Sequence, residues 1–174
     1  NCRGDAADNS SMPCRPTAGF ALMLMLLAAC QPTLNWREAR PAGSGAVALF
    51  PCKPEVDQRQ GMGLAQCEAA GKRFALSWAD LPDPTQLSPA LKAMPLALAT
   101  KLGQPLPPGL ALQVPGMTPL PDAVEYRLPA ATGVTYVGVF AHGGRVYQAV
   151  MSAPGDDKAD WESFRAGLAV ETAR

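Results

Sequence analysis

The sequence predicts an α+β fold, in which a single antiparallel β-sheet packs with two main helices. Two observations lead to this fold class. Several short segments alternate large apolar side chains with small or polar ones, as strands do, and tight turns separate them. Two other segments carry apolar side chains at helical spacing, one in the middle of the chain and one near its end.

Four strands are expected in the first half of the chain. A continuous apolar run that ends in Pro51 is typical of a buried strand, and the polar stretch after it of an exposed one. A hairpin follows, and in its second strand Phe74, Leu76 and Trp78 point to one face, which we expect to meet the next helix. The four expected strands are residues 45–51, 55–60, 64–68 and 73–80.

The first main helix is expected at residues 87–102, where leucine and methionine side chains form one stripe with a period near 3.6. Gly103 stands where a C-terminal cap belongs. Pro95 lies inside the pattern and is expected to kink or divide the helix. The stripe consists of Leu87, Leu91, Met94, Leu98 and Leu102.

A proline-rich passage at residues 104–122 predicts a rigid connector, with room for a short strand within residues 110–114. A role for it in binding peptides, or as a polyproline ligand, is the less favoured interpretation. Three more strands are then expected, two of them joined by a hairpin turn at His142-Gly143-Gly144. These strands are residues 124–128, 134–141 and 145–151.

The second main helix begins after Pro154-Gly155-Asp156-Asp157 and buries Trp161, Phe164 and Leu168. An aspartate at the N-cap and further acids in the first turn would satisfy free amides and complement the helix dipole. These acids lack the ligand spacing of an EF-hand, so we interpret them as capping residues and not as a calcium loop.

Residues 18–29 form an uncharged apolar run that is followed directly by Cys30. The run is shorter than the roughly 20 residues that a permanent membrane-spanning helix needs. With Arg15 before it and Leu27-Ala28-Ala29-Cys30 at its end, it resembles a bacterial lipoprotein signal peptide, which implies lipidation of Cys30. A buried core helix and a retained membrane anchor are the alternatives.

The signal implies a division of the chain into three parts. Residues 1–11 are upstream sequence or a mis-assigned start, residues 12–29 are the signal peptide, and residues 30–174 are a single α+β domain. The segment after Cys30 is too short to be a long stalk, so the domain is expected to sit near the membrane. Gln31 stands where some lipoproteins carry an inner-membrane retention aspartate, which favours the outer membrane, facing the periplasm.

Charge and cysteine content indicate which partners, disulfides and metal sites to expect. From Gln31 onward, 13 basic residues balance 13 acidic ones, so nothing points to nucleic acid as a partner. Cys52 and Cys67 are the thiols left after processing and acylation, and in an oxidising compartment they are expected to form one disulfide. Two separate buried thiols are the alternative. A zinc site is not expected, because no Cys-x-x-Cys spacing is present.

The domain also resembles a known group of proteins. The segments that carry the resemblance are residues 48–55, 74–82, 144–150 and 161–168. They are similar to small bacterial envelope proteins of undefined function that look like members of the PsbP-like group. The resemblance implies an antiparallel sheet packed between helices, an α/β/α sandwich, and it carries no catalytic signature.

No catalytic site, cofactor or metal is expected from the remaining polar residues. His142 is interpreted as a turn residue, and Asp83 as the cap of the following helix, although Asp80 and Asp83 could in principle act as an acid and base pair. The favoured hypothesis is a non-enzymatic, lipid-anchored accessory protein that binds an envelope partner. A protein that binds a small hydrophobic ligand near Trp78 and Leu98 comes second, and an unrecognised hydrolase third.

Overall fold

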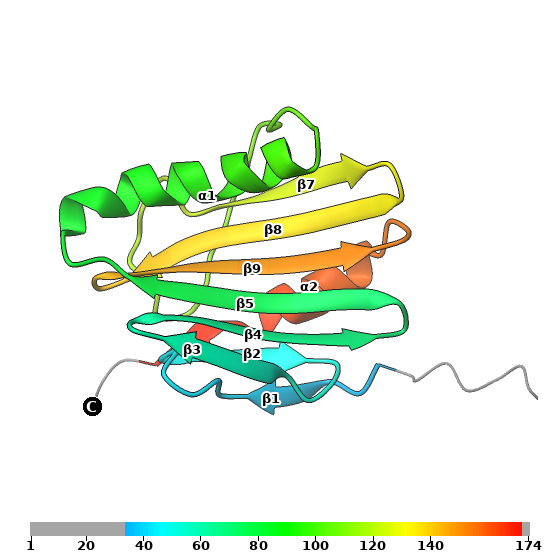
Figure 1. Ribbon diagram of the computed structural model, residues 1–174, viewed down its shortest axis with the longest axis horizontal. Coiled ribbons are helices and arrows are strands. Elements are labelled where there is room, and N and C mark those ends of the chain that lie inside the picture. Colours follow the sequence, from blue (N-terminus) through cyan, green and yellow to red (C-terminus); the bar gives the residue numbers. More distant parts are fainter. Residues whose placement is uncertain (1–33, 172–174) are drawn as a thin grey trace, which may run out of the picture. The chain divides into compact units, whose positions relative to one another are not determined.

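The computed structural model describes residues 34–171, which form two antiparallel sheets and two α-helices (Figure 1). Seven strands in the order β3-β4-β5-β9-β8-β7-β6 make the large sheet, and β1-β2-β10 make a small one. In chain order the elements are β1 (Arg37–Ala39), β2 (Ala46–Phe50), β3 (Glu55–Arg59), β4 (Met62–Ala69), β5 (Lys72–Asp80), the 3-10 turn η1 (Pro84–Gln86), α1 (Leu87–Lys101), β6 (Leu110–Ala111), β7 (Val124–Ala130), β8 (Gly133–His142), β9 (Arg145–Ala153), α2 (Lys158–Ala166) and β10 (Ala169–Val170).

The predicted α+β fold class is confirmed. The large sheet is antiparallel throughout, and the expected strands are present in it or, for β2, in the small sheet. The small sheet was not predicted, because its outer strands have three and two residues and carry no readable alternation.

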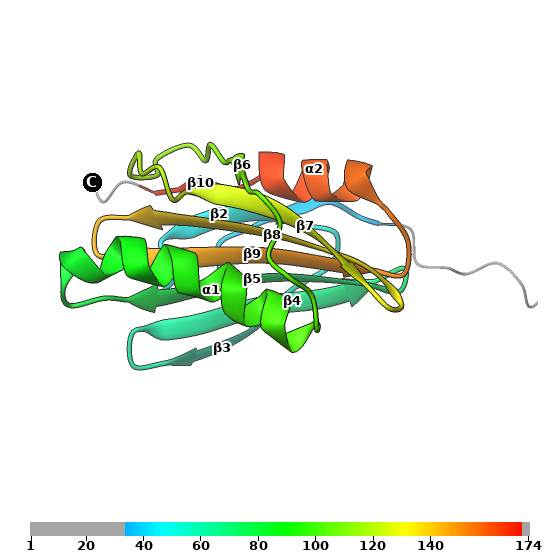
Figure 2. The same ribbon diagram turned by 90° about the horizontal axis from the view of Figure 1, so that it is seen from above.

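The helices lie on opposite faces of the large sheet, which gives three layers (Figure 2). Strand β8 is buried along most of its length because both of its faces are covered. Val137, Val139 and Ala141 face the α1 side, whereas Tyr136 and Phe140 face the side of α2 and the small sheet. The structure therefore has two separate cores, one on each face.

Helix α1 contains Pro95 but is not divided there. Leu91, Pro95 and Ala99 are buried one turn apart, so packing on β8 and β9 offsets the hydrogen bond that the proline cannot donate. Gly103 ends the helix as predicted: it has φ +68°, and Gln104 N donates to Ala99 O at 3.0 Å.

Trp161 and Phe164 of α2 are buried as predicted, and Leu168 is buried just beyond the end of the helix. An aspartate stands at the N-cap as predicted, but it does not bind the free amides there. Asp157 occupies the N-cap position and makes no side-chain capping hydrogen bond. Its carboxylate instead lies 3.0 Å from Lys72 Nζ, and that of Asp160 lies 2.5 Å from the same nitrogen. These carboxylates therefore bind Lys72, at the β4–β5 hairpin, instead of the free amides at the start of the helix.

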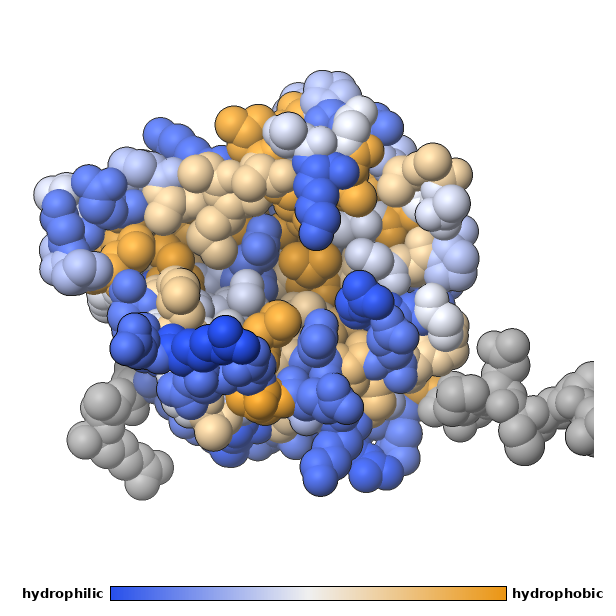
Figure 3. Space-filling view, in the orientation of Figure 1, coloured by the Kyte–Doolittle hydropathy of each residue, from blue (hydrophilic) through white to orange (hydrophobic). Residues whose placement is uncertain are grey.

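The face of β5 with Phe74, Leu76 and Trp78 is buried, but it meets a different helix from the one expected. The Phe74 ring lies 5.5 Å from the Phe164 ring of α2 and 5.6 Å from the Trp36 ring, between the centroids. Helix α1 packs on the other face, over β8 and β9. Helix α1 covers only part of that face, and hydrophilic residues predominate in the lower part of the same view, where β1, β2 and β3 lie in Figure 1 (Figure 3).

Among residues 34–171, no helix has the length and the apolar character that crossing a membrane requires.

Candidate interaction groove

An apolar groove of about 400 Å³ opens on the α2 side of the molecule. The proline-rich connector forms one wall, β7 and β8 contribute strand side chains, and α2 forms the other wall. The residues that line it are Pro107, Pro108, Leu110, Glu125, Tyr126, Arg127, Tyr136, Asp156, Lys158, Trp161, Glu162 and Arg165. We call this site the connector groove.

Aromatic rings form the inner part of the connector groove. Tyr136 and Trp161 stack with their ring centroids 5.6 Å apart, and both are almost fully buried. Trp161 Nε1 donates a hydrogen bond to Glu125 Oε2 at 3.0 Å, which fixes the indole ring. Leu110, by contrast, is 69% exposed at the rim and is available to an incoming side chain.

The charged residues of the connector groove are arranged in pairs. Arg127 Nη2 lies 2.8 Å from Asp156 Oδ2, Lys158 pairs with Glu162 at 3.3 Å, and Arg165 Nε lies 3.5 Å from Glu125. Because each cation has an acidic neighbour, apolar contact and shape distinguish the groove more than net charge does.

The Arg127–Asp156 pair also includes Tyr136, whose hydroxyl donates to Asp156 Oδ1. Hydrogen bonds from Arg127 and Tyr136 hold the pKa of Asp156 below its ordinary value. Burial, followed by the hydrogen bond to Asp156, raises the pKa of the Tyr136 hydroxyl. Asp156 therefore stays ionised and Tyr136 stays protonated, so this side of the groove keeps its geometry at neutral pH.

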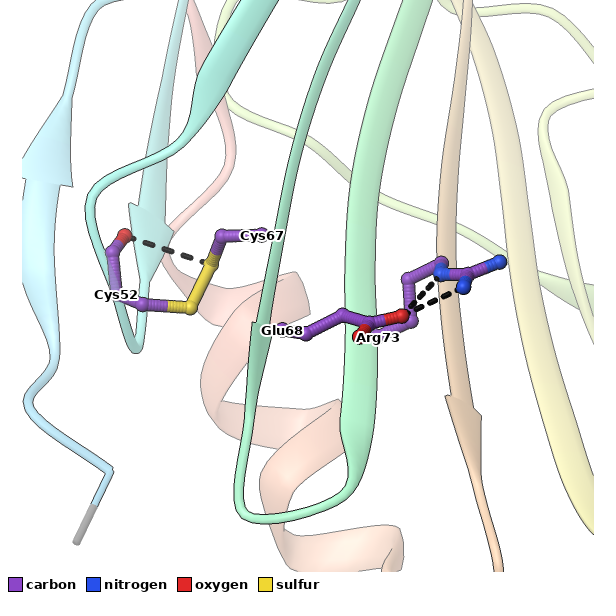
Figure 4. Close-up of a disulfide and its surroundings, with 4 residues drawn as sticks. All are labelled: Cys52, Cys67, Glu68 and Arg73. Atoms are coloured by element: carbon purple, nitrogen blue, oxygen red, sulfur yellow. Dashed lines mark hydrogen bonds and ion pairs between the residues drawn. A yellow bond between two sulfur atoms is a disulfide. The ribbon is translucent and has the colours of Figure 1, made fainter. Parts of the chain in front are cut away.

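The Cys52–Cys67 disulfide is present in the structure (Figure 4). Cys52 lies in the loop between β2 and β3, and Cys67 lies on β4, with 6.0 Å between their Cα atoms. The bond links the loop that follows β2 of the small sheet to β4 of the large one. Cys67 Sγ also lies 3.4 Å from the carbonyl oxygen of Cys52, and since a disulfide sulfur carries no proton we regard this as a packing contact. Cys30, the predicted lipidation site, lies outside the described residues.

The three residues considered for acid–base chemistry have separate structural roles. His142 Nδ1 lies 2.6 Å from the carbonyl oxygen of Gly116, in the connector. Asp83 accepts a hydrogen bond from Thr85 N at 2.9 Å, which confirms its predicted capping role. Asp80 binds Arg145, with Oδ1 2.5 Å from Nε. Each residue is engaged with its own partner, and the arrangement does not assemble a catalytic set from them.

The alternative hypothesis, a hydrophobic-ligand site near Trp78 and Leu98, is not supported by the structure, which places the two residues in different cores. Trp78 belongs to the core on the α2 side, whereas Leu98 packs into the core beneath α1, on the opposite face of the sheet. Side chains fill both spaces. Within residues 34–171, no group of three or more His, Cys, Asp or Glu side chains is placed to hold a metal ion.

Comparison with solved structures identifies the architecture. The solution structure of cyanobacterial PsbP (CyanoP) from Synechocystis sp. PCC 6803 matches with a TM-score of 0.50 and 10% sequence identity, over 83% of this chain and 98% of that chain. The fold is PsbP-like. A crystal structure from Bacteroides thetaiotaomicron VPI-5482 matches with a TM-score of 0.44 and 9% identity, over 82% of this chain and 50% of that one. At these identities the PsbP-like likeness concerns the fold alone.

The sequence itself matches no family model and no curated protein. The connector groove was not predicted, because its aromatic residues come from separate parts of the chain that the fold brings together. Tyr126 belongs to β7, Tyr136 to β8 and Trp161 to α2. The one signal in the sequence is the proline-rich passage, for which a rigid connector is the favoured interpretation and peptide binding the less favoured one.

Proposed function

We propose that this protein is a non-enzymatic, lipid-anchored accessory protein of the bacterial cell envelope. It is attached to the outer membrane through lipidated Cys30, faces the periplasm, and binds an extended segment of a partner protein in the connector groove. The proposal has two parts, the anchor and the partner site, and each can be tested separately.

The disulfide supports export from the cytoplasm. Disulfides form and persist in oxidising compartments such as the bacterial periplasm and are rare in the cytosol. The Cys52–Cys67 bond uses both cysteines that follow Cys30 in the chain, so no thiol would remain free in the processed, acylated protein. This agrees with the lipoprotein-like signal before Cys30.

The connector groove is the observation that carries the partner site. It is surface-accessible, and half of its lining residues are aromatic, proline or leucine side chains, whereas buried side chains pack the spaces between the large sheet and both helices. Grooves lined by aromatic and proline side chains suit extended peptide segments, because flat rings contact a narrow backbone closely. The exposed Leu110 at the rim supplies apolar contact area outside the inner aromatic part.

Site-specific photocrosslinking in intact cells tests the partner site. A photoreactive residue at position 110, in the groove, is expected to give a discrete crosslinked product with one envelope protein. The matched control is position 96, since Leu96 is 53% exposed on α1, on the opposite face. Leu110→Asp should weaken co-purification of the same partner. Equal products from both positions, or an unchanged partner yield with Leu110→Asp, would contradict the proposal.

Metabolic labelling tests the anchor. A labelled fatty acid should enter the protein in a bacterial host, and Cys30→Ala should abolish the incorporation. Unchanged labelling of the variant would exclude Cys30 as the attachment point.

A further inference from the structure

The first residues that the structure describes contact the rest of the domain at one end of the large sheet. Asn35 N donates a hydrogen bond to Pro51 O at 3.0 Å, and the Trp36 ring contacts the Phe74 ring edge to face at 5.6 Å. The chain is therefore held against the domain from Asn35 onward, just before β1 begins at Arg37.

The register of the large sheet shows which end this is. Phe74 is paired with Cys67 on β4 and with Met151 on β9, and Met151 is paired with Tyr136 on β8. This row lies close to the connections β4–β5, β7–β8 and β9–α2, which gather at the right of Figure 1. We call this the entry end. The β8–β9 turn, the β3–β4 turn and the start of α1 lie at the opposite, far end.

The tether is much shorter than the sheet. If Cys30 is lipidated, three residues separate it from Leu34. An extended chain covers at most about 14 Å from Cys30 to Leu34. Strand β8 has 10 residues, and a strand of that length extends about 33 Å. If the far end of the sheet lay on the membrane, Leu34 would be farther from the bilayer than the chain from Cys30 can extend.

Resting on the lipid anchor of the proposed function, we propose that the entry end faces the bilayer surface and that the far end points into the periplasm. The connections at the entry end suit this contact. Ala70-Gly71, Ala131-Thr132 and Pro154-Gly155 at these connections are uncharged, and the two aspartates that follow Gly155 are paired with Arg127 and Lys72. Close approach to lipid headgroups therefore desolvates no unpaired charge at these positions. Lys72 beside them is engaged by Asp157 and Asp160.

Position-dependent quenching tests this orientation. The lipidated full-length protein would be reconstituted in phosphatidylethanolamine–phosphatidylglycerol vesicles that carry a nitroxide on some headgroups. A fluorophore would be attached through Thr132→Cys at the entry end or Gln86→Cys at the far end, both of which are exposed positions. Quenching is expected to be several-fold stronger at position 132. Equal quenching, or stronger quenching at position 86, would overturn the orientation while leaving the anchor intact.

Two controls are included. The first distinguishes a wrong orientation from a missing anchor, and the second tests whether the short tether causes the orientation. Quenching at neither position above the level of the Cys30→Ala protein would contradict the anchor itself, and the orientation with it. Insertion of about 20 Gly and Ser residues before Leu34 should abolish the difference between the two positions, because such a linker has a root-mean-square length of about 25 Å. A difference that persists with this linker would show that the short tether does not set the orientation.

Discussion

The indole ring of Trp78 lies directly over Gly63, its paired residue on the neighbouring strand β4. A Cβ atom at position 63 would lie 2.1 Å from Cζ2 of that ring, and Trp78 is only 2% exposed, so the ring has no free space to move into. We expect Gly63→Ala to lower the free energy of unfolding by about 1–3 kcal/mol through overpacking. Urea denaturation measures the change, and Gly155→Ala, in an exposed loop, is the control. Equal stability of the two variants would show that the ring yields to the added methyl.

Asp80 and Arg145 join the ends of β5 and β9 through two hydrogen bonds, at 2.5 and 2.9 Å. Arg145 Nη1 also donates to Gly43 O and Ser44 O, so the pair links the large sheet to the turn before β2. The hydrogen bonds from Arg145 hold the pKa of Asp80 below its ordinary value of 3.8.

The lowered pKa of Asp80 predicts how the free energy of unfolding changes at acid pH. The contribution of Asp80 is complete above the unfolded-state pKa and is lost as the pH falls through the folded-state pKa. We expect Asp80→Asn to cost about 0.5–1 kcal/mol from pH 5 to 7, because the half-exposed carboxylate is screened by solvent. The difference from the wild-type protein should shrink below about pH 4. Asp57→Asn, which removes an exposed pair with Arg59, is the control. A difference that is constant down to pH 2 would refute the assignment.

Lys72 connects the β4–β5 hairpin to the start of α2 through Asp157 and Asp160. Burial alone would lower the pKa of Lys72, but the hydrogen bonds to the two carboxylates outweigh it and raise the pKa. We expect Lys72→Met to lower the free energy of unfolding by about 1–3 kcal/mol, since two carboxylates lose their partner in a partly buried site. Lys92→Met removes a pair in which the lysine is 68% exposed and should change stability by less than about 0.5 kcal/mol. Thermal unfolding of both variants makes the comparison.

The disulfide closes a loop with a sequence separation of 15 residues. For a loop of this size, the chain-entropy account gives a stabilisation of about 3 kcal/mol. We expect the Cys52→Ser and Cys67→Ser double variant to be less stable by about that amount in urea denaturation. Mass spectrometry of the non-reduced domain should find the two cysteine peptides joined, and recovery of both thiols free would contradict the bond.

Local patterns predicted most of the individual elements. The alternation of Phe74, Leu76 and Trp78 is a property of adjacent residues, and so are the leucine stripe of α1 and its terminal Gly103. What lay beyond prediction depends on residues far apart in the chain. Asp157 binds a lysine about 85 positions away instead of capping its own helix. The connector groove is lined by Tyr126, Tyr136 and Trp161, which come from three different elements. Each of them is predicted correctly as a strand or helix residue when it is considered alone.

The Cys52–Cys67 bond has a mechanical consequence for a tethered protein. Under the proposed lipid anchor, tension on Cys30 would enter the domain at Leu34 and reach β1, which is held to β2 by three residue pairs. Cys52 follows β2 by two residues, and its bond to Cys67 would pass part of this load to β4 near the entry end. Because β2 also pairs with β10, the disulfide would give this load a covalent route into the large sheet beside the hydrogen bonds of the small one.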